Sequence, residues 1–477
     1  MRIDTYRIFN YALLTRRVFR ISFNIYLFCK MDLDWAKAAQ KRAEAKSTHV
    51  SFPQLKYPSL RDDGLRDPVQ WLAGKAMDDG AEGLWRIHDK LYDLTTFIKR
   101  HPGGEEWLEL TKGTDITEAF ESHHLNPATE KILTQYYIRD AKTPRNSPFT
   151  FKEDGFYKTL KRAAFEELKK IPKDASKTAD KITDGLFISL LITSSFACWV
   201  ENSFAAKFWY AFASISLALL TVACHNFIHR KTNWRMYLFN MSMWSYRDFR
   251  VSHVLSHHLY TNTLMDLELS SLEPVLFYNP RKDKPLHAKL GFITEIFFFP
   301  FVFLLSFTKR FLSIFLHQGF FGMHCRWHDA IGLTLPIWMW LTSHAPILHV
   351  IYTWLYINCT GSLIFYSIAV NAAHHHPDAI KDGDQPRSLT PDWGMHQVEA
   401  LLDRKDVNRS VLAVMTLFGE HALHHMFPTV DHSLLRYLHP IFIEHCEKYQ
   451  ANYRASTQFK LVLGQIKETM RSEFKII

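Results

Sequence analysis

The chain has 477 residues, of which 47% are hydrophobic and 14% aromatic, and a net charge of +9. This length exceeds that of one ordinary compact domain, so we expect two or more units. The high content of Phe and Trp indicates a membrane-embedded part combined with a soluble part. The basic excess is typical of loops that face an anionic membrane leaflet. Nucleic-acid binding is excluded as an interpretation, because the sequence contains no basic recognition module.

Residues 1–50 are expected to form a poorly defined N-terminal extension. Within the first thirty residues, arginines alternate with apolar residues and Asp4 is the only acid. A targeting or anchoring segment is one interpretation. The arginines interrupt the apolar run too often for a secretory signal, so we favour an extension without a fold and Met31 as an alternative start.

A soluble part precedes the membrane part. Residues 31 to about 145 are polar and mixed, which predicts a small soluble domain. Residues 146–183 are lysine-rich with a helical pattern, and we expect a linker helix that runs to the membrane surface. Residues 184–450 then form the membrane domain, and residues 451–477 form a C-terminal tail. Six cysteines are scattered without a CxxC pair, which indicates a reducing compartment for the soluble part.

Four apolar segments predict an all-α, multi-pass membrane domain with four spans: residues 185–200, 208–224, 330–343 and 347–371. Each segment is near the ~20 residues that cross a bilayer once flanking residues are added. The first two form one hairpin, and the last two form another. A fifth apolar segment at residues 290–307 contains Glu295 and Pro300, which favour a re-entrant or surface-lying helix.

The soluble domain contains a histidine motif, FIKRHPGG, at residues 97–104. A strand-like run, WRIHDKLYDL, precedes it, and the sequence GTDITEAFESHH follows at residues 113–124. Two histidines on opposite sides of a haem fill both axial positions of its iron, which leaves no position for oxygen and favours one-electron transfer.

Residues 55–140 resemble the cytochrome b5 haem-binding domain on these motifs. The resemblance implies an α+β haem domain that holds haem b through bis-histidine iron. His101 matches the first axial ligand of that family. His124, four residues after Phe120, matches the second ligand, and His123 is the alternative.

Three histidine clusters flank the apolar segments. They read His225-x3-His229, then His253-x3-His257-His258, then His421-x2-His424-His425. This spacing places imidazoles one turn apart on a helix face, and imidazole binds iron, zinc and copper. A structural zinc site needs only four ligands, so eight histidines favour two metal ions. Ligands that meet at one centre lie on one side of the membrane, so an even number of spans separates the second cluster from the third.

These clusters resemble, in order, the histidine boxes of membrane fatty acid desaturases. The resemblance implies a non-haem di-iron centre in which the eight box histidines are the catalytic metal ligands. A further element, Asn371-x3-His375, is similar to one that supplies additional iron ligands in acyl-CoA desaturases. On that match Asn371 and His375 are candidate ligands, whereas His374 and His376 are neighbours or bystanders.

The combined resemblance is to fusions of cytochrome b5 with a desaturase, including the group called cytochrome b5-related. It implies O2-dependent desaturation of fatty acyl chains, with electrons passing from a NADH-cytochrome b5 reductase-type donor through the haem to the di-iron centre. It also implies a multi-pass protein of the endoplasmic reticulum, with the haem domain and the boxes in the cytosol. Front-end fusions usually begin the third box with Gln, so His421 leaves the position of the double bond open.

Three other functions compete with desaturation. A hydroxylase on the same scaffold is one, because attack on a C–H bond can end in either product. A catalytically silent membrane electron-transfer haemoprotein is another, although every expected histidine position is filled. A structural membrane adaptor would leave the histidines without a role.

Overall fold

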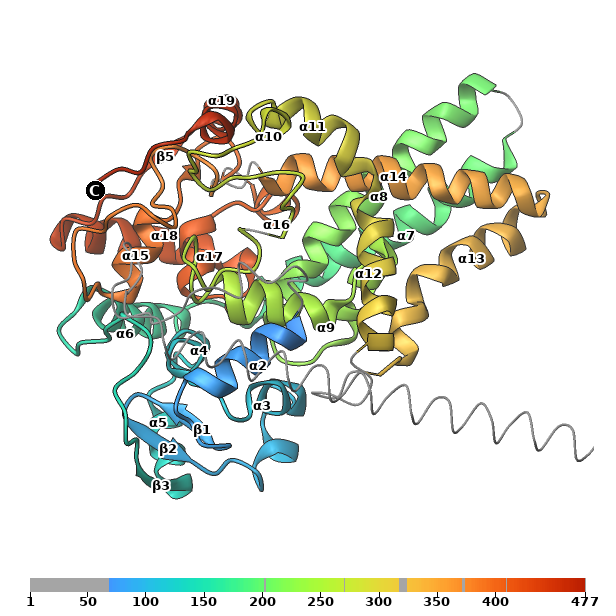
Figure 1. Ribbon diagram of the computed structural model, residues 1–477. Helices are drawn as coiled ribbons and strands as arrows, with labels where there is room; N and C mark the ends of the chain where they lie inside the picture. The colour runs from blue at the N-terminus through green and yellow to red at the C-terminus, as the bar shows by residue number, and fades with distance from the viewer. Residues whose placement is uncertain are drawn as a thin grey trace, which may run out of the picture.

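The computed structural model describes residues 68–200, 203–269, 271–316, 324–370, 374–408 and 410–476. The expected N-terminal extension, residues 1–50, lies outside these residues. A small α+β domain, coloured blue to teal, packs against one side of a larger helical domain (Figure 1). The chain is therefore built as expected from a soluble domain followed by an apolar helical one.

The small domain surrounds a three-stranded antiparallel sheet of order β1-β2-β3. Its elements are α2 (Pro68–Asp78), β1 (Trp85–Ile87), β2 (Lys90–Tyr92), α3 (Glu105–Thr111), α4 (Thr117–His123), α5 (Ala128–Leu133) and β3 (Tyr137–Asp140). Trp85 is fully buried in its core and donates an indole hydrogen bond of 3.1 Å to the carbonyl oxygen of Leu108. This bond joins the sheet to α3, one of the helices that face the large domain.

The large domain is helical apart from a two-stranded parallel pair, β4 (Asp403–Arg404) with β5 (Ala455–Ser456). Its helices are α6 (Phe156–Leu168), α7 (Lys177–Trp199), α8 (Ser203–Ile228), α9 (Tyr246–Phe249), α10 (Leu286–Lys289), α11 (Gly291–Phe298), α12 (Val302–Leu316), α13 (Thr334–Ser343), α14 (Ile347–Val370), α15 (Trp393–Glu399), α16 (Val411–Thr416), α17 (His421–Met426), α18 (His432–Lys448) and α19 (Gln458–Met470). A π-helix, Arg250–His257, continues directly from α9.

The lysine-rich segment forms α6, which packs against α18 as part of the helical body. Phe156, Tyr157 and Leu160 on its apolar side are buried, whereas Arg162 and Lys169 are exposed. A helix is therefore present within the segment, and the role of residues 146–183 as a linker to the membrane surface stays a prediction.

Four helices among the described residues are long and apolar enough to cross a membrane: Asp174–Trp199, Phe204–Ile228, Gly291–Phe315 and Ile347–Val370. The number agrees with the prediction, but the set differs. Helix α13 has only 10 residues, fewer than the ~20 that cross a bilayer. The segment at 291–315 is the third candidate span instead, because α11 and α12 are joined through a 3-10 turn, Phe299–Phe301. Two candidate spans still separate the second histidine cluster from the third.

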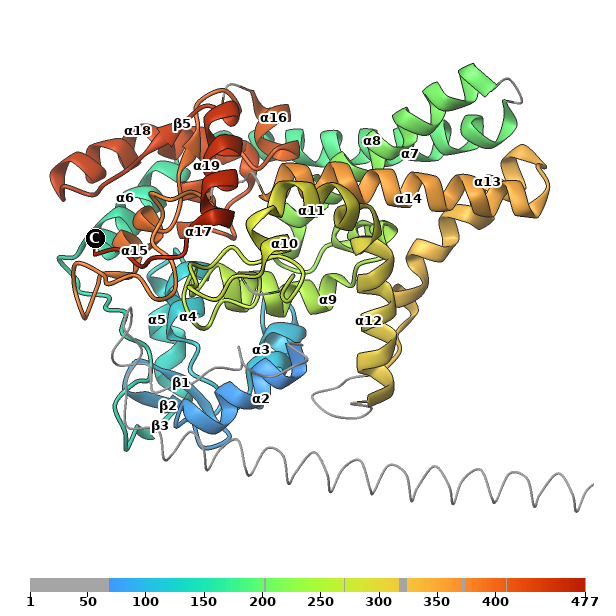
Figure 2. The same cartoon turned by 45° about the horizontal axis from the view of Figure 1, so that its top comes forward.

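Four of the apolar helices extend away from the rest of the molecule as two hairpins, α7 with α8 and α13 with α14 (Figure 2). Gly361 on α14 allows a close approach to α8, because a Cβ atom there would lie 3.1 Å from Leu217 Cδ2. Small residues at such crossings are typical of packing between membrane helices. On α12, the charge of Arg310 is paired within the protein with Asp248 at 2.8 Å and with Asp329 at 3.1 Å.

Polar groups at the interface hold the two domains together. Glu106 on α3 is paired with Arg247 at 2.8 Å and with Arg250 at 2.6 Å. The hydroxyl of Tyr157 lies 3.2 Å from the carbonyl oxygen of Glu121 in the small domain and 3.1 Å from that of Met426 at the end of α17. Tyr157 is fully buried, so water does not replace these contacts.

Replacing Tyr157 by Phe should destabilise the docked arrangement by about 1–3 kcal/mol, because it removes a donor from buried carbonyl groups. The measurement is the apparent melting temperature of the detergent-solubilised protein. Tyr449→Phe is the matched control, since that hydroxyl is bonded to Asp154 at the surface, where water substitutes for it. An equal loss of stability in both variants would contradict the role assigned to Tyr157.

Candidate active site

His101 and His124 face each other in the small domain, with ring centroids 6.2 Å apart. The Nδ1 atom of His101 is hydrogen-bonded to the carbonyl oxygen of Gly104 at 2.8 Å, and that of His124 to the carbonyl oxygen of Phe120 at 3.0 Å. Each Nδ1–H is therefore donated to the backbone, which leaves the Nε2 lone pair for a metal ion. The pair has the donor chemistry of a bis-histidine haem site.

His123 is turned in another direction. Its ring meets Trp107 edge-on at 5.6 Å, and its Nδ1 atom lies 2.9 Å from Ser122 Oγ. The structure thus brings His124, and not His123, to His101. Gly104 has a φ of 110°, a conformation that favours glycine, and a Cβ atom at Gly103 would lie 2.9 Å from the His101 ring. Both glycines of the motif are required by the turn beside His101.

The eight box histidines all lie buried in the large domain, although they come from distant parts of the chain. Five of them form one group in which a ligand nitrogen of each lies within 4.8 Å of the others: His225, His229, His253, His258 and His424. The Nε2 atom of His225 is 2.7 Å from that of His253 and 2.9 Å from that of His229. The end of α8, the π-helix and α17 therefore meet at one point.

The π-helix changes which histidines of the second box point together. The amide of His258 is bonded to the carbonyl oxygen of His253 at 2.9 Å, a spacing of five residues. Their Nε2 atoms lie 3.0 Å apart. The sequence had indicated His253 and His257 as the pair on one helix face, but His257 directs its Nε2 atom to a second group.

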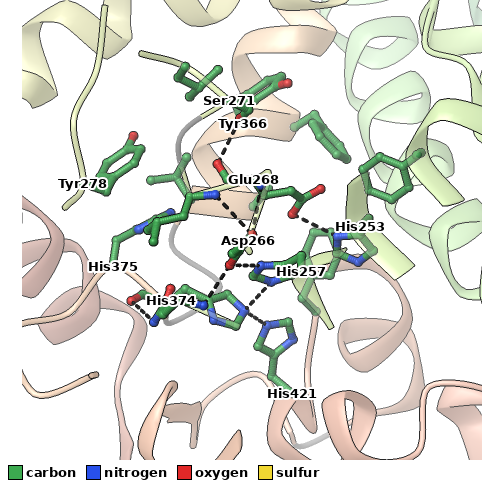
Figure 3. Close-up of a pocket in the computed structure, with 18 of the residues that line it drawn as sticks. His253, His257, Asp266, Glu268, Ser271, Tyr278, Tyr366, His374, His375 and His421 are labelled. Carbon is green, nitrogen blue, oxygen red and sulfur yellow. Dashed lines mark hydrogen bonds and ion pairs between the residues drawn. The ribbon is translucent and has the colours of Figure 1, made fainter. Parts of the chain in front are cut away.

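The second group contains His257, His374 and His425. The Nε2 atom of His374 lies 3.2 Å from that of His257 and 2.6 Å from that of His421. The two groups contain seven of the eight box histidines together with His374. The eighth, His421, is in neither group but lies beside the second one, through His374 (Figure 3).

His375 does not join either group. Its ring is stacked on that of Tyr278 at 3.8 Å, and its Nδ1 atom lies 3.4 Å from Lys381 Nζ (Figure 3). Asn371, the other candidate of the same element, lies outside the described residues. The sequence analysis predicted that His374 is a neighbour or bystander. In the structure, His374 is the residue of this element whose Nε2 atom lies beside those of His257 and His421.

Two carboxylates contact histidines of the second box at their Nδ1 atoms, opposite the Nε2 atoms that face the groups. Asp266 Oδ2 is 2.8 Å from His257 Nδ1, and Glu268 Oε2 is 2.9 Å from His253 Nδ1. Such contacts fix the orientation of a ligand and increase its basicity. Burial lowers the pKa of His257, but the charge and hydrogen bond of Asp266 together with the charge of Glu268 outweigh this effect, so the pKa is raised. In the sequence, Asp266 and Glu268 are recognisable as the pair of acidic residues that follows the second box.

The remaining buried imidazoles are held neutral, the form that binds metals. Burial is the main cause that lowers the pKa well below its usual range for six of them: His253, His258, His374, His421, His424 and His425. A neutral imidazole carries one N–H, so crowded Nε2 atoms cannot all be satisfied by one another. The two groups therefore fit two metal ions.

His432 is a further histidine that the motifs missed. It is buried, and its ring lies 4.3 Å from that of His424. It lies seven residues after the third box, at the start of α18. Apart from its residue type, nothing in the sequence there indicates a role at the site.

A cavity of about 100 Å³ opens beside the second group (Figure 3). Its histidine wall contains His257, His374 and His421. The apolar side is lined mainly by the aromatic residues Trp244, Phe249, Phe365, Tyr366 and Phe418, together with aliphatic side chains, and the polar side includes Glu268, Ser271, Tyr278 and His375. An apolar chain that enters here would lie against the histidine side chains of the second group.

Two families match the chain, and together they cover both domains. Residues 202–457 match the family described as Fatty acid desaturase, and residues 72–142 match the Cytochrome b5-like Heme/Steroid binding domain. No solved structure matches the chain.

Three relatives illustrate the likeness along nearly the whole length. A "Cytochrome b5-related protein" of Drosophila melanogaster is 40% identical, over 88% of this chain and 95% of the relative. A "Probable Delta(5) fatty acid desaturase C" of Dictyostelium discoideum is 26% identical, over 79% of this chain and 89% of the relative. An "Acyl-lipid (8-3)-desaturase" of Mortierella alpina is 26% identical, over 78% and 90%. The chain therefore belongs to the fatty acid desaturase family of membrane oxidoreductases, and carries a cytochrome b5-like haem domain fused in front of it.

Proposed function

We propose that this protein desaturates fatty acyl chains with O2 at a non-haem di-iron centre, and that its own b5 haem supplies the electrons. The observation that carries the proposal is the pair of convergent histidine groups beside an apolar cavity. Neutral imidazoles with carboxylate partners are donors that iron accepts. The desaturase family of the chain supports the same assignment.

The ligand set that we propose follows the two groups of nitrogens. One iron would be held among His225, His229, His253, His258 and His424, and the other among His257, His374, His421 and His425. Haem would be held by His101 and His124. Asn371 stays a candidate from the sequence, whereas His375 supports the polar wall of the cavity through Tyr278.

Iron and O2 supply the chemistry that removes hydrogen from an unactivated C–H bond, which protein side chains alone do not. The side chains of this protein have three supporting tasks. Asp266 and Glu268 orient His257 and His253. Phe365 and Tyr366 on α14, with Phe249, offer the acyl chain an apolar wall and exclude water from it. The buried histidines of the two groups other than His257 stay neutral, so their nitrogens remain available to metal.

The location of the two domains supports a cytosolic site at a membrane. The haem domain and helix α17, which carries the third box, lie at the same end of the apolar hairpins (Figure 1). We infer that this side faces the cytosol of the endoplasmic reticulum membrane, where a NADH-cytochrome b5 reductase-type donor would reduce the haem.

Expression in a desaturase-deficient yeast should produce a new unsaturated fatty acid, because the proposed site has both a metal centre and an electron source. Gas chromatography–mass spectrometry of total fatty acids is the measurement. A hydroxylated product would instead assign the hydroxylase reaction. A b5-type visible spectrum without any new product would contradict both and favour an electron-transfer protein.

The two cofactor sites should be separable by mutation, because they share no ligand. We expect His101→Ala to abolish the haem absorbance and to retain non-haem iron, and His257→Ala to do the reverse. Absorption spectroscopy and metal analysis of the same purified samples would show this. Loss of both cofactors from each variant would refute the independence of the sites.

Asp266→Asn should weaken metal binding by about 10–100-fold, the effect of removing a partner that orients a ligand. The measurement is the non-haem iron retained against a graded chelator, relative to haem in the same protein. Glu295→Gln is the control, since Glu295 is also buried but is bonded to Tyr278 and Gln465 rather than to a histidine. Equal iron loss in both variants would assign the effect to general destabilisation.

A further inference from the structure

A buried stack of three side chains lies where the haem domain meets the metal centre. Trp107 and Glu106 on α3 face Arg250, the first residue of the π-helix. The guanidinium carbon of Arg250 lies 4.5 Å from the Trp107 ring, and its Nη1 atom is 2.6 Å from Glu106 Oε2. Arg250 is 0% exposed, so a counter-charge and an aromatic face replace its water.

The stack reaches the haem site at one end. Trp107 meets the ring of His123 at 5.6 Å, and His123 is the chain neighbour of His124. The carbonyl oxygen of His123 also accepts a hydrogen bond of 3.3 Å from Thr429, three residues after α17 ends. His123 therefore stands between the haem ligand and the large domain.

The other end of the stack reaches the metal-binding histidines. Arg250 Nε donates a hydrogen bond of 3.2 Å to the carbonyl oxygen of Ile228, the residue before His229. Phe249, the residue before Arg250, is stacked on His253 with centroids 4.4 Å apart and planes at 14°. Both His229 and His253 belong to the group of five histidines.

We propose that His123, Trp107 and Arg250 form the route by which electrons cross from the haem domain to the metal centre, with Trp107 as the positioning and bridging residue. This rests on the proposed function, because it requires both cofactors. In each event one electron leaves the haem iron, which is oxidised, and enters the metal centre, which is reduced. No bond in the three side chains forms or breaks.

A second tryptophan at the interface, Trp71, is placed differently. Trp71 is also buried and crosses the same interface, since its indole donates a hydrogen bond of 3.0 Å to the carbonyl oxygen of Met265. Its ring lies beside Tyr260 and Lys75 rather than beside a haem or metal histidine. Trp71 therefore provides a control for loss of an interface tryptophan that lies off the route.

The test uses the full-length protein with both cofactors in detergent, without O2. The haem is reduced by a flash with a flavin photoreductant, and its reoxidation by the ferric metal centre is followed by absorbance. Trp107→Leu should slow this reoxidation by about tenfold, equivalent to about 1.4 kcal/mol of barrier. Trp107→Phe, which retains an aromatic ring, and Trp71→Leu should remain near the wild-type rate.

Two readouts that do not depend on turnover separate a route from a structural role. The haem potential should be unchanged in all variants, and hydrogen exchange of residues 246–257 should be the same in Trp107→Leu and Trp71→Leu. The proposal would be overturned if Trp107→Leu slowed reoxidation but also had faster hydrogen exchange at residues 246–257 than Trp71→Leu. Equal reoxidation rates in Trp107→Leu and Trp71→Leu would overturn it too. Reoxidation that persists after the metal is removed would overturn it too. Trp107-dependent reoxidation in a protein that makes no acyl product would support the route and refute the proposed function.

Discussion

The structure depends on the burial of many imidazoles at one place. Eight box histidines and His374 lie within the large domain, with nitrogen atoms at distances that hydrogen bonds between neutral rings cannot all satisfy. Such a cluster suits cations, and it requires that the side chains be held in place through their other ring nitrogen. Asp266 and Glu268 do this for two of them, and the helices that carry the boxes are packed into the same core.

Much of this arrangement could be predicted from the sequence, because it depends on residue type and short spacing. The HPGG motif predicted His101, and the boxes predicted the eight histidines that the structure brings together. The choice of His374 over His375 could not be predicted, since a one-residue offset depends on how the chain leaves α14. The role of His257 was also hidden, because the extra residue of a π-helix has no reliable signal in the sequence.

The error in the membrane spans has a similar physical origin. Residues 330–343 are apolar enough to suggest a span, but the helix there is short and begins only after a 3-10 turn, Trp327–Leu333. Glu295 and Pro300 suggested that the preceding apolar segment could not span. In the structure Glu295 is satisfied by Tyr278 and Gln465, and Pro300 sits in a turn that joins two helices. The local sequence shows Glu295 but not the residues that satisfy it, because these lie elsewhere in the chain.

The contact of Glu106 with Arg247 and Arg250 has a consequence for how such an enzyme works in a crowded membrane. A separate haem carrier must find its acceptor by diffusion, so the supply of electrons varies with the amount of carrier. In the proposed function the donor is part of the same chain and already docked, which would replace a bimolecular encounter by an intramolecular one. The supply of electrons would then not depend on how dilute the protein is in the bilayer. A cell could express more of this protein without a matching increase in its pool of free carrier.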